Sequence, residues 1–179
     1  NATSDNAINV LDGAAAIGSN GVGGSIAVTI NDDTTLGYVG DMADAESSST
    51  IDPTILTLSN ADISATTNND LHSLLIAGAG GYVAGIAAMA NVTTLSSKTK
   101  SGIYGAQVNH ADGDTKVGGV TVKANENDSV DAKVGGAAVG VTGAGIGIAA
   151  NVVVLHSSVT GTILGGDINS GSAVDVEAL

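Results

Sequence analysis

The sequence contains no cysteine, no phenylalanine, no tryptophan and a single proline. Without cysteine, disulfide bonds and thiolate–metal sites are excluded. Aromatic residues normally supply much of a thick globular core, each burying roughly 150–250 Å², but here only three tyrosines are present. The hydrophobic 43% of the chain is therefore almost entirely Val, Ile, Leu and Ala, with 26 glycines among them. Such small side chains suit a thin interior of stacked layers better than one thick core.

Positive charge is also scarce: 5 basic residues stand against 18 acidic ones, for a net charge of −13. A nucleic-acid partner needs a Lys/Arg footprint, so we expect none. Residues 134–155 carry no charge and are long enough to cross a bilayer as a helix. However, the related stretches 14–30 and 74–90 are rich in glycine, and no Lys/Arg cluster sets an orientation. We therefore expect no membrane span.

Self-comparison reveals a repeat of about sixty residues. Residues 23–36, 83–96 and 143–156 align, and two further landmarks recur in each unit: a "YVG", "YG" or "LGG" turn and a closing V-x-V-type strand. The aligned structural positions are Ile26, Ile86 and Ile146, together with Asn31, Asn91 and Asn151. The units are residues 1–60, 61–124 and 125–179, which we expect to form one continuous domain resembling three units of a longer array.

Each unit is predicted to consist of strands. "VTVKA" (120–124) and "VDVEA" (174–178) alternate with period two, and every glycine would cost a helix about 1 kcal/mol relative to Ala. A sixty-residue sandwich without aromatics would bury too little surface to be stable alone, whereas a solenoid buries each coil against its neighbours. The sequence therefore predicts an all-β fold, a parallel β-helix (β-solenoid) of about three such units. Coils of about twenty residues would give three coils per unit, although no such sub-period is visible.

The stretch "GAGIGIAANVVVL" (143–155) would have two different faces as a strand. One face carries Ile146, Ile148, Ala150, Val152 and Val154, and the other carries Gly145, Gly147, Ala149, Asn151 and Val153. We expect the bulky face to fill the interior. The flat face would then pack closely against another sheet or a neighbouring chain.

No catalytic constellation is present, so we expect the protein not to be an enzyme. His72, His110 and His156 do not share a repeat position, and no serine lies in a G-x-S-x-G elbow. A polysaccharide-cleaving β-helix would need converging carboxylates or basic residues, and the few lysines show no focus. The repeated asparagines are predicted to bond along the stack or to a turn backbone.

Calcium is the one cofactor that the sequence leaves open. Asp112, Asp114 and Asp167 lie in stretches that combine oxygen donors with glycine, as loops for hard cations do. None of these stretches fits the EF-hand loop or the calcium-binding β-roll repeat. Solvated turns are therefore the favoured interpretation, and we expect no cofactor.

The repeat unit resembles those of very large bacterial filamentous adhesins, a group that includes the fusobacterial leukotoxin and filamentous-haemagglutinin-like exoproteins. The features that carry the resemblance are the Gly-rich strand with its asparagine, the "YVG/YG/LGG" turn and the closing V-x-V-x-A, and they cover all three units. The resemblance implies a parallel β-helix shaft, secretion to the bacterial cell surface, and adhesion or fibre formation.

Two functions follow from this resemblance as hypotheses. The first is a structural shaft or fibre segment of a secreted surface adhesin, with self-association or neighbouring repeats of a longer chain as partners. The alternative is a solenoid module that binds carbohydrate or host protein along its side, which a groove lined by Tyr38, Tyr82 and Tyr104 would support.

Overall fold

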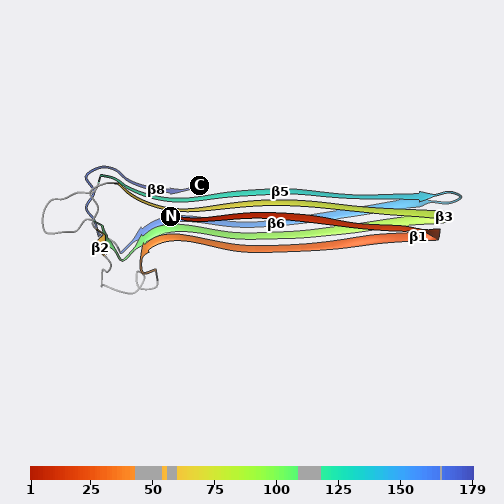
Figure 1. The fold of residues 1–179 in the computed structure, drawn as a ribbon, viewed down its shortest axis with the longest axis horizontal. Coiled ribbons are helices and arrows are strands. Elements are labelled where there is room, and N and C mark those ends of the chain that lie inside the picture. The colour runs from red at the N-terminus through yellow and green to blue at the C-terminus, as the bar shows by residue number, and fades with distance from the viewer. Residues whose placement is uncertain (43–53, 56–59, 109–117, 166) are drawn as a thin grey trace.

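The computed structural model describes residues 1–42, 54–55, 60–108, 118–165 and 167–179. Over these residues the chain is all-β and contains no helix, which confirms the predicted class. The strands are β1 (Ala2–Gly40), β2 (Thr54–Ile55), β3 (Ala61–Tyr104), β4 (Gln107–Val108), β5 (Val120–Gly140), β6 (Gly145–Leu164), β7 (Asp167–Ile168) and β8 (Val174–Ala178). The long strands run side by side along the longest axis of the molecule (Figure 1).

Every strand pairing in the described residues is parallel. β1 pairs with β3 over almost its full length, the first half of β3 pairs with β5, and its second half pairs with β6. β8 continues the order by pairing with the start of β5. The short strands β2, β4 and β7 form a second parallel sheet. Successive units of the sequence therefore add successive layers of strand to the same sheet.

The strand β3 folds back on itself. Thr67 and Thr99 belong to this one strand, yet their hydroxyl oxygens lie 2.7 Å apart, and Ser101 Oγ donates to the Ile63 carbonyl at 3.0 Å. We call residues 2–18, 61–81, β5 and β8 the outgoing layer, and residues 20–40, 85–104 and β6 the return layer. The two layers meet at the turn end, around residues 19, 81–84 and 141–144, and the opposite end, with β2, is the loop end (Figure 1). Each unit thus runs out along one layer and back along the other, in place of three short coils.

Each return strand ends at a glycine in the left-handed region. Gly40, Gly105 and Gly165 have φ of 95°, 57° and 64°, and they are the glycines of the repeated "YVG", "YG" and "LGG" landmark. Side chains rarely adopt this conformation, because a Cβ would crowd the backbone. The turn motif seen in the sequence therefore has a direct conformational cause.

Near the turn end, glycine keeps the two layers unusually close. A Cβ added at Gly21 would lie 2.4 Å from the Gly80 carbonyl oxygen, and one at Gly147 would lie 2.6 Å from that of Gly136. Larger buried side chains occur in two clusters further along. One is near the loop end (Ile63, Ile103, Ala106, Val108, Val120, Val122), and the other lies between it and the turn (Ala27, Leu75, Ala77, Ala79, Ala87, Met89).

The predicted orientation of the bulky aliphatic face is wrong. Ile26, Ile86 and Ile146 are 74%, 37% and 48% exposed, and the glycine-bearing face of β6 points inward instead. Because the layers approach too closely for branched side chains, the period-two alternation places glycine inside and isoleucine outside. The expectation that the flat face packs against another sheet agrees with the structure: that sheet is the opposite layer of the same chain.

The register matches the sequence repeat in two units and differs in the first. Ile86 pairs with Ile146, and Asn91 pairs with Asn151. Ile26 pairs instead with Ala90, and Asn31 with Leu95, four residues beyond the aligned positions. The boundary drawn at residues 124/125 also falls inside β5.

Candidate functional surfaces

The outer side of the return layer is aliphatic across all three units. We define the aliphatic face as the outward residues of this layer nearest the turn end: Val22, Gly24, Ile26, Val28 and Ile30 of β1, Ile86, Ala88, Ala90, Val92 and Thr94 of β3, and Ile146, Ile148, Ala150, Val152 and Val154 of β6. None of these residues is charged, and all of the Ile residues on it are exposed. A contiguous exposed apolar patch on this scale marks an interaction site more often than an ordinary surface.

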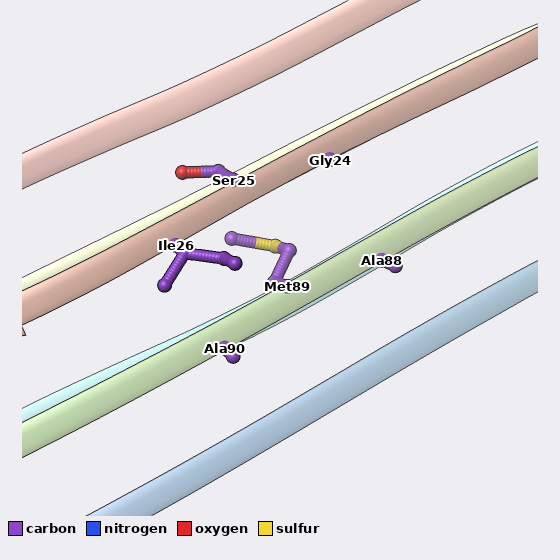
Figure 2. Close-up of a pocket in the computed structure, with 6 residues that line it drawn as sticks. All are labelled: Gly24, Ser25, Ile26, Ala88, Met89 and Ala90. Carbon is purple, nitrogen blue, oxygen red and sulfur yellow. The ribbon is translucent and has the colours of Figure 1, made fainter.

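A hollow of about 510 Å³ lies on the part of this face that β1 and β3 form. It is lined by Gly24, Ser25, Ile26, Ala88, Met89 and Ala90. Figure 2 shows Ser25 and Met89 leaving their strands on one side, and Ile26, Ala88 and Ala90 leaving on the other. The hollow exists because the outward positions next to Ile26 carry small residues, so a branched side chain stands directly beside a depression.

The outer side of the outgoing layer is apolar only near the turn end. Its exposed aliphatics are Leu11, Ile17, Leu74, Ile76 and Val139. Leu74 pairs with Lys133, and a hollow of about 270 Å³ there is lined by Asn9, Leu11, His72, Asp131 and Lys133, among others. This face is therefore a mixed surface, unlike the aliphatic face.

The charged groups at that edge form an exposed ion network. Lys133 Nζ donates to Asp131 at 2.5 Å, His72 Nδ1 lies 3.8 Å from the same carboxylate, and His72 Nε2 lies 3.2 Å from Asp70. The hydrogen bond from Lys133 lowers the pKa of Asp131 below its ordinary value, and His72 adds to the effect. Exposed pairs of this kind contribute little to stability.

Inside the molecule, asparagines link one unit to the next. Asn69 Oδ1 accepts from Asn6 at 3.1 Å and from Asn31 at 3.4 Å, while Asn69 Nδ2 donates to Asp128 at 2.8 Å. This connection runs through all three units. Because Asn69 is buried and its partners lie between the layers, its amide satisfies polar groups that water reaches poorly.

A second ladder connects the repeat asparagines themselves. Asn91 Nδ2 donates to Asn151 Oδ1 at 3.0 Å, which is the bonding along the stack that the repeat predicted. Asn31 makes its bond to Asn69 instead, because the register of β1 is displaced by four residues.

Three carboxylates lie beside this polar interior. Burial raises the pKa of Asp128 above its ordinary 3.8, and a hydrogen bond with Glu126 and the charges of Glu126 and Asp33 raise it further, against the opposing hydrogen bond from Asn69. Asp33 Oδ2 accepts from Asn6 at 3.1 Å, and Glu126 Oε2 accepts from Thr99 at 3.0 Å. Asp128 and Glu126 bond side chains of the neighbouring unit, although the like charges of the three carboxylates repel one another.

Of the three calcium candidates, Asp167 alone lies in the part of the chain that the structure describes. Asp167 lies in the exposed strand β7, and Asp112, Asp114 and His110 fall outside the described residues. Across residues 1–42, 54–55, 60–108, 118–165 and 167–179, no three His, Asp or Glu side chains converge as metal ligands. His72 and His156 lie on the outer sides of different layers.

The three tyrosines do not line one groove. Tyr38 and Tyr104 form an edge-to-face pair at the loop end, with ring centroids 6.1 Å apart and an interplanar angle of 79°. Tyr82 lies at the turn end, and the strand that separates it from Tyr104 spans roughly 70 Å at ~3.3 Å per residue. A carbohydrate groove built from all three rings is therefore contradicted.

Comparison with known proteins adds no relative. No family model, no curated protein and no solved structure matches the chain. A search of the described residues also finds no helix with the length and hydrophobicity to cross a membrane.

Proposed function

We propose that the chain is a structural segment of a β-solenoid shaft in a secreted bacterial surface adhesin. The observation that carries this proposal is the parallel stacking of whole units: β1 pairs with β3, and β3 pairs with β5 and β6, over nearly all of their length. The proposed role is mechanical, since the stack holds its shape through backbone hydrogen bonds while other parts of an adhesin bind. The bacterial surface location rests on the resemblance of the repeats.

A further strand, β8, stacks on the start of β5. Val174 to Ala178 pair with Val120 to Ala124, and the amide of Glu126 donates to the Leu179 carbonyl at 2.9 Å. Among the described residues, β5 beyond Ala124 and the whole of β6 pair with a strand on one side only. Such edges are templates for further strands.

Stacking of this kind gives the shaft an unusual shape. Each unit is about 65 Å long, for twenty residues at ~3.3 Å each, but adds only ~4.8 Å along the direction in which units stack. Three units therefore make a blade whose long axis follows the strands (Figure 1), and a tall shaft requires many units. This spacing supports a repeat array in a very large protein better than a small independent module.

The shape is tested by inserting further copies of residues 61–119 between residues 119 and 120. We expect small-angle scattering to show the particle growing by ~4.8 Å per copy in one direction, with its strand length unchanged. Independent compact lobes of that size would each add about 25 Å, from the radius of gyration of a sixty-residue domain. Growth by the larger step would contradict the shaft.

The location is tested by labelling intact cells of the source bacterium with an antibody against the chain. Labelling without permeabilisation is the expected result. Labelling that appears only after permeabilisation would contradict a surface adhesin.

A further inference from the structure

We propose that the aliphatic face binds the same face of a second copy of this chain, so that two shafts pair side by side. This inference deepens the proposed shaft function by naming the surface through which shafts associate. It rests on three properties of that face, namely its lack of charged residues, its area and its surface shape.

Electrostatic repulsion is lowest where two copies meet at the aliphatic face. The chain carries a net charge of −13, so two copies repel each other over most of their surfaces. The aliphatic face contains no Asp, Glu, Lys or Arg among its fifteen positions. Two such faces can therefore meet without burying a charge, which is the costly step in association.

The area of the aliphatic face is in the range of a weak dimer interface. The five outward positions of each strand span about 30 Å, and three strands span about 14 Å, which gives roughly 450 Å² per copy from strand geometry. Pairing across all three strands would bury at most roughly 900 Å², just below the ~1,000 Å² at which specific interfaces begin. A dimer of three-unit chains is thus expected to be weak.

The surface shape of the aliphatic face suits pairing with a second copy. Ile26 stands 74% exposed beside the hollow at Gly24, Ala88 and Ala90 (Figure 2). A two-fold axis through this region would place Ile26 of each copy in the hollow of the other, because an isologous interface pairs a surface with itself. A projecting group and its complementary depression are therefore already adjacent on one face.

The outgoing face is a poorer candidate. Lys133 and the His72–Asp131 network lie next to its aliphatic residues, so a partner would have to bury or avoid these charges. It supplies a matched control, because Leu11 is as exposed as Ile26 and also lies on β1.

The test is sedimentation equilibrium of the 179-residue protein with the variants Ile26→Glu and Leu11→Glu. We expect a reversible monomer–dimer equilibrium for the wild type and for Leu11→Glu, and a Kd at least about ten-fold higher for Ile26→Glu, since its carboxylate would be buried without a partner. Circular dichroism should be unchanged, because both side chains point outward. A monomeric wild type at millimolar concentration, or equal effects of the two variants, would overturn the proposal.

Cysteine cross-linking gives an independent readout, because the chain has no cysteine of its own. Under mild oxidation with copper phenanthroline, Ala90→Cys should form a disulfide-linked dimer. Ala137→Cys, on the outer side of the outgoing layer, should remain monomeric. Equal cross-linking of the two variants would contradict the assigned face.

A lipid surface is the competing occupant of such a face. Co-sedimentation of the wild type with phosphatidylcholine vesicles, combined with a monomer in solution, would assign the face to lipid and overturn pairing. If scattering shows single blades that grow by ~4.8 Å per inserted unit, with no dimer, the pairing proposal fails and the shaft proposal stands.

Discussion

At the scale of the residue, position relative to the two layers decides what a glycine does. Gly85 and Gly78 belong to the same strand, β3. A Cβ at Gly85 would lie 2.7 Å from the Val139 carbonyl oxygen, whereas one at Gly78 would meet nothing within 4 Å. The first glycine allows close approach of the backbones, and the second points outward into open space.

Gly85→Ala should therefore destabilise the fold by about 1–3 kcal/mol, the usual cost of overpacking. Gly78→Ala should be neutral or stabilising by up to about 1 kcal/mol, because alanine restricts the unfolded chain. Urea denaturation measures both values. Equal losses at the two positions would contradict the inward and outward assignment.

The carboxyl of Asp128 gives the interior a pH dependence. Its pKa is raised in the folded state, above 3.8, chiefly by burial and with contributions from Glu126 and Asp33. The folded protein therefore holds this proton more tightly than the unfolded chain, so the contribution to stability is fully present below pH 3.8 and is lost as the pH rises through the folded pKa.

Asp128→Asn should remove this dependence and raise the midpoint of thermal unfolding at pH 7 by up to about 3 °C. Asparagine retains an oxygen that can accept from Asn69 Nδ2, while the repulsion with Glu126 and Asp33 disappears. Thermal unfolding of the variant and the wild type between pH 3.5 and 7 measures the effect. A wild type that loses stability on acidification below pH 5 more steeply than the variant would contradict the sign.

At the scale of the element, a strand is fixed to its neighbours by inward polar side chains as well as by its backbone. Asn69 and Asn68 are adjacent in β3. Asn69 is buried, and its side-chain hydrogen bonds link all three units. Asn68 is on the outer side and forms hydrogen bonds with Asp5 and Asn127 near solvent. Because side chains alternate between the two sides of the strand, a substitution at Asn69 is expected to cost stability, whereas one at Asn68 is expected to be tolerated.

Asn69→Ala should cost about 1–3 kcal/mol, because Asn6, Asn31 and Asp128 each lose a partner in a poorly hydrated space. Asn68→Ala should change stability by less than about 0.5 kcal/mol, as is usual for exposed sites. Chemical denaturation of the two variants compares them directly. An Asn68→Ala effect as large as that of Asn69→Ala would contradict the buried ladder.

At the scale of the whole molecule, stability depends on how many neighbours a unit has. Leu95 and Leu155 occupy paired positions on β3 and β6, yet Leu95 is fully buried and Leu155 is 53% exposed. The difference arises because β3 has a strand on both sides, whereas β6 lies at the end of the stack. In such arrays each interface adds a nearly constant amount of free energy.

The midpoint of thermal unfolding should therefore rise with each inserted copy of residues 61–119 and then level off. The reason is that every insertion adds a fully covered unit while the number of end units stays constant. Differential scanning calorimetry on chains with one, two and three inserted copies measures this. An unchanged midpoint would indicate that the units unfold independently.

The sequence by itself determined the class of fold and the parallel repetition. Strand alternation, the abundance of glycine and the absence of large aromatics all required thin, stacked strands, and the repeat placed Ile86 opposite Ile146 and Asn91 opposite Asn151. The turn landmark also had a purely local cause, since Gly40, Gly105 and Gly165 all adopt positive φ.

Only the tertiary structure decided which side of each strand faces the interior and how many residues each unit runs before it turns back. Both faces of residues 145–154 are apolar, so their periodicity cannot distinguish interior from surface. The distance between the two layers makes that choice, because it admits the glycines and excludes the isoleucines. The four-residue displacement of Ile26 and Asn31 likewise follows from how the first unit pairs along β3, and a repeat read within one chain contains no information about that pairing.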